Sequence, residues 1–336
     1  MTDALARPLV GLLPVLSLLA ALLYLDSYKL VKLRAVVAVL ASGAVIAAAT
    51  YPLNELFLGR FTLPLATFSR YVAPASEELL KALVIVVLIR AHRIGFLVDA
   101  AIFGFAVGTG FATAENLYYL QLMPDATLGT WVVRGFGTAL MHGGATAIFG
   151  VMGLALVERR AGPWVQAVLP GLALAIVLHS GFNHFFMSPR ISTLGIVAVL
   201  PPLLYAVFHL SERSLGDWLG KGFDADTAML ELINSGRFAD SPAGRYLHTL
   251  KDKFQGPVVA DLLCYLRLRT ELSLRAKGIL MMRENGFEVP PDQATRDAFT
   301  EMRYLEKSIG RTGVLAIQPM LGMSHKDLWQ LYILGK

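Results

Sequence analysis

The sequence predicts an all-α protein, with a polytopic membrane helix bundle of about seven spans (residues 1–212) followed by a C-terminal soluble helical domain (residues 213–336). Of the 336 residues, 55% are hydrophobic and 16% are charged, whereas soluble domains average about 25% charged residues. Seven apolar stretches are long enough to cross a bilayer. The charge is also uneven, because residues 1–212 hold only 23 of the 55 charged residues.

The seven apolar stretches give the expected spans in chain order. These are residues 8–24, 33–53, 71–89, 98–121, 131–157, 164–187 and 191–210. The first stretch has no obvious small-residue cleavage site, so it is expected to be a retained helix rather than a signal peptide. Residues 54–70 are too short and too mixed to cross, and are expected to lie along the outer interface. Gly104, Gly108 and Gly110 of the fourth stretch allow close helix packing.

Basic residues in the short loops predict the orientation. The first, third and fifth loops hold seven Lys and Arg residues, and the alternate loops hold three. Because cytoplasmic loops carry an excess of Lys and Arg, we expect a multi-pass protein of the cell (cytoplasmic) membrane with its N-terminus outside and its C-terminal domain in the cytoplasm. The lone cysteine, Cys264, fits a reducing compartment for that domain. The net charge of +5 is too small to indicate a nucleic-acid partner.

The C-terminal segment is expected to form helices. Apolar residues recur at helical spacing across residues 298–309, with charged residues between them. Gly236 and Gly286 are predicted helix stops, and Pro290–Pro291 predicts a turn. No catalytic motif is found in this segment. Its role is therefore unknown, and a cytoplasmic protein partner is one candidate.

Ionisable side chains within four consecutive spans are the strongest functional signal. Such groups cost about 2.5–3.5 kcal/mol each on insertion scales, so they are rare where no function requires them. They are Glu77, Glu78, Glu115, His142 and His179. Counted at 1.5 Å per residue, all five lie roughly 9–17 Å below the outer surface. Asn183 shares a helix face with His179. We therefore predict that these six residues form one catalytic site in the outer half of the bilayer.

Neighbouring polar residues are expected to support this site. Glu77 and Lys81 are four residues apart on one helix face, which predicts an ion pair within the membrane. Asn116 is expected to orient Glu115 through a hydrogen bond. Arg134 lies near the outer end of its span and is expected to extend its charge to the membrane surface rather than into the site.

Two hydrolytic mechanisms fit these residue types. In the first, His142, His179 and Glu78 bind a zinc ion that activates water, and a second glutamate acts as the general base. In the second, no metal is used: a desolvated glutamate activates water, and histidine and asparagine stabilise the oxyanion. The sequence lacks the His-Glu-x-x-His motif of soluble zinc proteases. Whether the predicted peptidase is of the metallo or the glutamic type stays open.

Two other function classes use the same residue types. A proton-coupled transporter or channel could use the glutamates and histidines as a relay. However, the sequence shows no inverted repeat and no paired broken helices, and a relay would spread through the depth of the bilayer. An inactive scaffold with a partner-binding tail is less favoured, since every key residue type is present.

Four segments of the chain resemble the PrsW family of intramembrane proteases and, more distantly, the type II CAAX prenyl endopeptidase superfamily. They are SEELLKA (76–82), DAAIFGFAVGTGFATAENLYY (99–119), RGFGTALMHGGATAIFG (134–150) and HSGFN (179–183). Their order and spacing agree over roughly residues 70–190. The resemblance implies a multi-pass hydrolase that cuts a membrane-embedded or membrane-tethered protein within the lipid bilayer. In the PrsW family this substrate class includes membrane-anchored anti-sigma factors.

The resemblance also implies roles for the matching residues. Glu77 and Glu78 would be the paired carboxylates, His142 and His179 would be metal ligands or oxyanion donors, and Asn183 would assist His179. The chain departs from the prenyl endopeptidase pattern at Thr138, where that pattern has Phe four residues before the histidine. The C-terminal domain lies outside the matched core.

Overall fold

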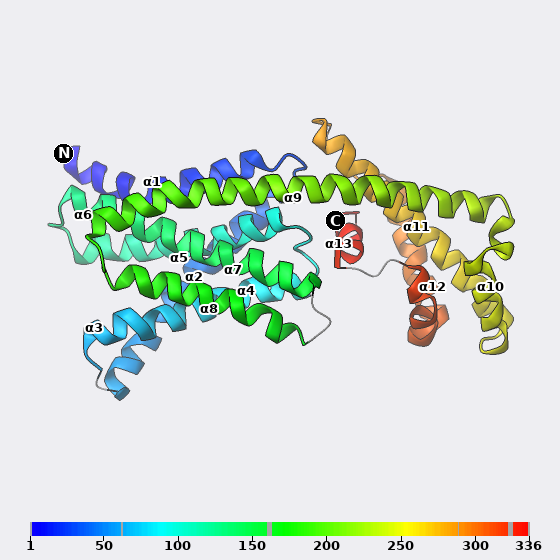
Figure 1. Cartoon of the computed structure of the whole chain (residues 1–336), viewed down its shortest axis with the longest axis horizontal. Helices are drawn as coiled ribbons and strands as arrows, with labels where there is room; N and C mark the ends of the chain where they lie inside the picture. Colours follow the sequence, from blue (N-terminus) through cyan, green and yellow to red (C-terminus); the bar gives the residue numbers. More distant parts are fainter. Residues whose placement is uncertain (1, 62, 160–162, 288, 322–324, 335–336) are drawn as a thin grey trace. The chain divides into compact units, whose positions relative to one another are not determined.

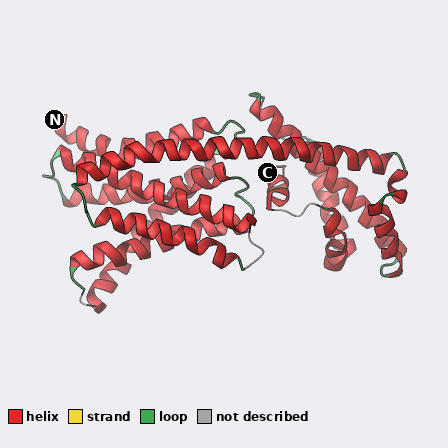
Figure 2. Ribbon diagram, in the orientation of Figure 1, coloured by secondary structure: helices red, strands yellow, loops and turns green. Residues whose placement is uncertain are grey.

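The computed structural model shows a chain built from helices (Figures 1 and 2). It describes residues 2–61, 63–159, 163–287, 289–321 and 325–334. Every regular element within these ranges is helical, which confirms the all-α prediction. The chain divides into two compact units, Met1–Glu212 and Arg213–Lys336.

The first unit contains eight α-helices and the beginning of a ninth, among its described residues. They are α1 (Thr2–Leu25), α2 (Leu33–Phe61), α3 (Leu65–Thr67), α4 (Ala73–Arg90), α5 (Leu97–Leu122), α6 (Leu128–Val132), α7 (Leu140–Arg159), α8 (Trp164–Asn183) and α9 (Pro189–Asn234). Two π-helical segments, η1 (Phe68–Val72) and η2 (Val133–Ala139), lead directly into α4 and α7. Such segments often occur at functional sites.

Six helical runs of the described chain are long and apolar enough to cross a membrane. They are α1, α2, α5, the continuous run from α6 to α7, α8 and α9. This confirms the membrane helix bundle. The predicted third span also forms a helix, α4, which is 18 residues long. Its composition alone does not qualify it as a span, because it carries Glu77, Glu78, Lys81 and Arg90.

Several helix boundaries differ from the predicted ones. Helix α2 continues to Phe61 instead of ending at residue 53, and Phe57 stacks on Phe61 one turn later. Much of the expected interfacial segment is therefore helical. Helix α9 continues to Asn234, far beyond the predicted end at residue 210, and a left-handed glycine, Gly236, follows it. Helix α8 ends at Asn183, four residues before its predicted end.

Helix α5 forms the centre of the membrane unit. It packs against α1, α2 and α7, and most of its length is buried. A Cβ atom built on Gly104 would lie 2.6 Å from the Thr146 carbonyl oxygen, and one on Gly108 would overlap the carbonyl of His142. The backbones of α5 and α7 can approach this closely only because both positions are glycine. This contact fixes His142 beside α5.

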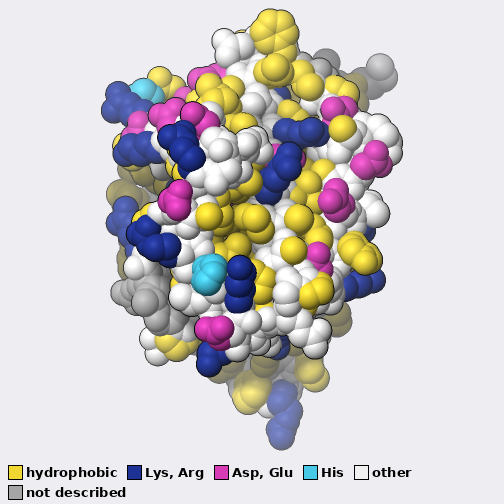
Figure 3. Space-filling view, turned by 90° about the vertical axis from the view of Figure 1, so that its right-hand side faces the viewer, with side chains coloured by type: hydrophobic (Ala, Val, Ile, Leu, Met, Phe, Trp, Pro, Cys, Tyr) yellow, Lys and Arg dark blue, Asp and Glu magenta, His cyan; other side chains and the backbone are white. Residues whose placement is uncertain are grey.

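The second unit is a smaller helical core. Its further helices are α10 (Pro242–Thr249), α11 (Gly256–Glu284), α12 (Gln293–Ile317) and α13 (His325–Leu334), with short 3₁₀ segments η3 (Arg237–Asp240), η4 (Leu250–Asp252) and η5 (Gln318–Met320). Gly236 (φ 76°) and Gly286 (φ 82°) follow the ends of α9 and α11, which confirms the predicted helix stops. On the face drawn in Figure 3, Lys, Arg, Asp and Glu side chains surround a central group of hydrophobic side chains.

Candidate active site

Four helices of the membrane unit bring the predicted polar residues together. Glu77 and Glu78 lie in the second turn of α4, Glu115 on α5, His142 in the first turn of α7 and His179 in the last turns of α8. Glu78, His142 and His179 are at most 3% exposed. Each is within hydrogen-bond or ion-pair distance of another member of the set. The five ionisable groups therefore meet at one level in the bundle.

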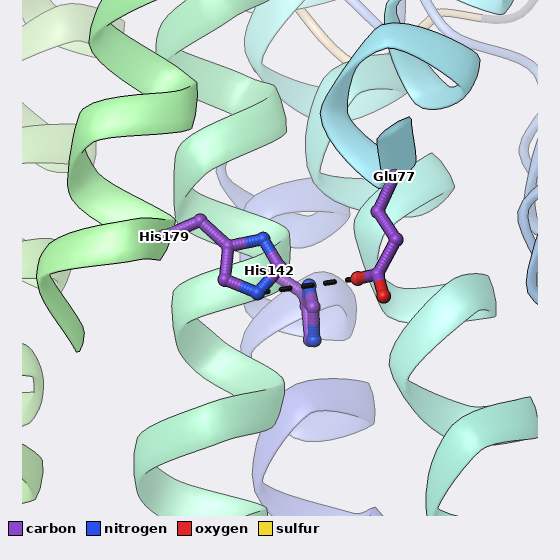
Figure 4. A group of neighbouring side chains, drawn as sticks. All are labelled: Glu77, His142 and His179. Carbon is purple, nitrogen blue, oxygen red and sulfur yellow. Dashed lines mark ion pairs between the residues drawn. The ribbon is translucent and has the colours of Figure 1, made fainter. Parts of the chain in front are cut away.

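His179 contacts both carboxylates of α4. Its Nδ1 lies 2.8 Å from Glu78 Oε1, and its Nε2 lies 3.9 Å from Glu77 Oε2 (Figure 4). A carboxylate accepts a hydrogen bond from Nδ1–H, so the neutral ring has its lone pair on Nε2. That lone pair faces Glu77.

Lys81 links the glutamate pair to the second histidine. Its Nζ lies 2.5 Å from Glu78 Oε1 and 3.1 Å from His142 Nδ1, and the residue is fully buried. The predicted ion pair between Glu77 and Lys81 is therefore wrong, because the lysine pairs with Glu78, three residues away. Both spacings place residues on one helix face, so the spacing alone does not distinguish the two carboxylates.

His142 is held from both of its ring nitrogens. Since Nδ1 accepts a hydrogen bond from the Lys81 ammonium, the neutral ring carries its hydrogen on Nε2. That nitrogen lies 3.4 Å from Glu115 Oε2. The rings of His142 and His179 are 4.6 Å apart and nearly perpendicular.

Arg134 belongs to the site, contrary to the prediction that it extends to the membrane surface. Its Nη2 lies 3.1 Å from Glu115 Oε2, and its Nε donates to Asn116 Oδ1 at 2.8 Å. Its guanidinium also lies 3.9 Å from the ring centre of Tyr119. Asn116 donates to the Gly11 carbonyl oxygen. Asn116 thus orients Glu115 through Arg134 rather than by a direct bond.

Asn183 has a different contact from the predicted one. Its amide donates to the Ser69 carbonyl oxygen at 2.9 Å, and Ser180 donates to the Arg70 carbonyl oxygen at 2.5 Å. Because α8 ends at Asn183, this side chain reaches η1 rather than turning back along α8 towards His179. Asn183 therefore connects α8 to the segment that leads into α4.

Three residues of the site have the donor chemistry of a metal centre. Glu77, His142 and His179 each offer one ligand atom, and these atoms lie within 4.8 Å of one another. Two imidazoles and one carboxylate form the protein ligand set of His₂Glu zinc sites. The predicted set contained Glu78 instead. In the structure Glu78 contacts His179 Nδ1 and Lys81, which is how an outer carboxylate orients a metal-binding histidine.

Comparison with known families identifies the membrane unit. The family model described as PrsW family intramembrane metalloprotease matches residues 31–209, more than half of the chain. This range contains every predicted site residue and Arg134. No curated protein and no solved structure matches the chain. A match to a family of proteases does not favour the transporter interpretation. The chain belongs to the PrsW family of intramembrane metalloproteases.

Proposed function

We propose that this intramembrane peptidase is a zinc enzyme that cleaves a membrane-tethered protein in the outer half of the cell membrane. The hydrogen bond between Glu78 and His179 is the observation that supports this most, because it turns the His179 Nε2 lone pair towards Glu77. Glu77, His142 and His179 would hold the ion. To do so, His142 would give up either the hydrogen on its Nε2 or the Lys81 contact at its Nδ1. When bound, zinc lowers the pKa of water to about 7 and polarises a carbonyl group.

Glu115 is the proposed general base. Its carboxylate lies 3.4 Å from His142 Nε2, next to the proposed ligand set, and its side chain is more exposed than those of Glu77 and Glu78. A base at this position takes the proton from the attacking water and donates it to the leaving amine nitrogen. Arg134 compensates the charge of the carboxylate and holds it in position.

Glu78 and Lys81 have a positioning role in this proposal. The Lys81 ammonium contacts both Glu78 and His142, so it fixes His142 directly and His179 through Glu78. A carboxylate that accepts from Nδ1–H, as Glu78 does, sets the tautomer and the ring orientation of a metal-binding histidine. Because Glu78 and Lys81 are buried, they also exclude water from the part of the site that they occupy.

We also propose an orientation of the protein in the membrane and a class of partner for the second unit. The excess of Lys and Arg in the odd loops supports an outside N-terminus and a cytoplasmic second unit. The substrate would then be cut near the outer leaflet, and the second unit would be free to bind a cytoplasmic protein.

Glu77→Gln tests the proposed metal site directly. The purified protein in detergent is expected to contain about one zinc ion per chain, and the variant is expected to lose most of it because an amide is a weaker ligand than a carboxylate. Cleavage of a membrane-tethered reporter should fall with the metal content. Metal analysis and gel-based cleavage measure both quantities.

Glu55→Gln is the matched control, since Glu55 is exposed on α2 and outside the site. It should keep both metal and activity. Full cleavage by a metal-free preparation would support the glutamic mechanism instead, and full cleavage by Glu77→Gln would remove Glu77 from the site.

Arg134→Met is expected to lower kcat about 10- to 100-fold with little change in KM. The variant leaves Glu115 without its cation, so the proposed base is misplaced during proton transfer. Steady-state kinetics on the reporter separates kcat from KM, and Arg134→Lys should recover part of the loss. Arg190→Met, at an exposed position, should behave like the unmodified protein. Unchanged kcat in Arg134→Met would show that the contact is only structural.

A further inference from the structure

A small polar cavity lies within the second unit, and its lining comes from that unit alone. Its volume is about 50 Å³, and residues of α9, α11 and α13 line it, including Asp226, Arg269, Asp327 and Gln330. One water molecule takes about 30 Å³ in the liquid, so the cavity has room for a compact polar group. None of the roles assigned to the membrane site uses these residues.

Arg269 brings a buried positive charge to this cavity. The residue is 8% exposed, and its Nη2 has no hydrogen-bond partner among the described residues. Its Nη1 makes a long bond of 3.4 Å to the Tyr265 hydroxyl, which itself donates to Glu306. A guanidinium shielded from water needs an acceptor for its free N–H groups.

Gln330 faces the same cavity from α13. It is 4% exposed, and its Oε1 has no hydrogen-bond partner within the described ranges. The amide can rotate by 180° with little change in shape, which would turn its NH₂ group towards a ligand. Two buried side chains with unused hydrogen-bonding atoms, from two helices, therefore meet at one cavity.

The acidic residues of the lining do not replace a ligand for Arg269 Nη2. Asp226 lies 2.6 Å from Lys277 Nζ and accepts a hydrogen bond from Ser273 at 2.5 Å, so its charge is already compensated. Asp327 is partly buried and has an interaction of its own, so its charge is not free for Arg269. Arg269 is the buried cation of the lining, and a negatively charged group is its natural complement.

We propose that this cavity binds a small oxyanion, namely the carboxylate or phosphate group of a soluble ligand, through Arg269 Nη2 and the Gln330 amide. Such a ligand would bridge α13 and α11. The packing of the second unit would then depend on the concentration of the ligand. The proposal concerns only this unit and does not depend on the chemistry assigned to the membrane site.

Titration calorimetry on the full-length protein in detergent tests the proposal, with inorganic phosphate and acetate as separate probes. One saturable site per chain is expected for at least one probe, and the tighter probe identifies the ligand group. Arg269→Met should weaken this Kd about 10- to 100-fold, because it removes a charge-assisted hydrogen bond. Arg267→Met, an exposed arginine on the same helix, should leave the Kd unchanged.

Two further variants test the role of Gln330 and the location of the binding site. Gln330→Leu should weaken the Kd about tenfold without removing a charge, which covers the case in which Arg269→Met does not fold. His179→Ala should keep the affinity, which excludes binding at the membrane site. The absence of saturable binding by both probes at about 10 mM would overturn the proposal and leave the cavity to water. So would an unchanged Kd in folded Arg269→Met or in Gln330→Leu.

Discussion

His179→Ala is expected to abolish proteolysis, lowering kcat/KM for a membrane-tethered reporter by at least about a thousandfold. The imidazole contacts Glu78 through Nδ1 and faces Glu77 through Nε2, so it connects the positioning carboxylate to the proposed metal ligands. Alanine removes one of three protein ligands and leaves the other two too weak to hold zinc in an open site. Metal content should therefore fall together with activity.

His184→Ala is the matched control for this experiment. His184 lies directly after α8, where its Nδ1 contacts the Ser180 carbonyl oxygen and its ring packs against Tyr71. The control should keep both cleavage and zinc to within a few-fold. Because the two variants remove the same side chain five residues apart, any general loss of folding near the end of α8 would affect both. Normal cleavage by His179→Ala would contradict the proposed site.

The sequence predicted which residues meet because their level along the helices follows from chain position alone. Hydropathy fixes where a span begins, and the helical rise then fixes the level of each polar residue. Glu115 and His142 lie on different helices, yet this count placed them at one level, where their side chains are 3.4 Å apart. The close packing of neighbouring helices at the glycines of α5 was also predictable, since small residues in an apolar helix indicate close packing.

The pairing within the site was not predictable, because it depends on rotation about each helix axis and on neighbours remote in sequence. Lys81 can reach either Glu77 or Glu78 from its own helix, and the choice of Glu78 depends on where α7 and α8 place their histidines. Arg134 was missed because it lies in the π-helical segment η2, whose wider turn departs from the α-helical period used to read the sequence. The sequence indicated only that Arg134 is a basic residue close to the level of Glu115.

The predicted ends of several helices were also wrong. The predicted ends at residues 53 and 210 mark where the apolar stretches stop, yet α2 continues to Phe61 and α9 to Asn234. Both helices also run through prolines (Pro52, and Pro201 with Pro202). Within a bundle, neighbouring helices and local adjustments can satisfy the backbone groups that proline leaves free. Hydropathy therefore marks where an apolar stretch ends, and a helix can continue beyond that point.

Lys81→Met is expected to lower the free energy of unfolding by about 3–5 kcal/mol, because it leaves the Glu78 carboxylate buried without its cation. Both side chains are at most 1% exposed, so water cannot replace the lost ammonium. Thermal unfolding in detergent measures the loss. Arg190→Met, which removes an exposed charge, should change the midpoint very little.

The double variant Lys81→Met/Glu78→Gln separates folding from chemistry. Removing both charges leaves no uncompensated ion, so much of the stability should return, and the two single losses should not add. Activity should nevertheless stay about 10- to 100-fold low, because an amide orients His179 less strongly than a carboxylate does. Recovery of stability and of cleavage together would show that the buried pair only holds the helices in place. Recovery of stability alone would assign the Glu78–Lys81 pair to the positioning of the two histidines.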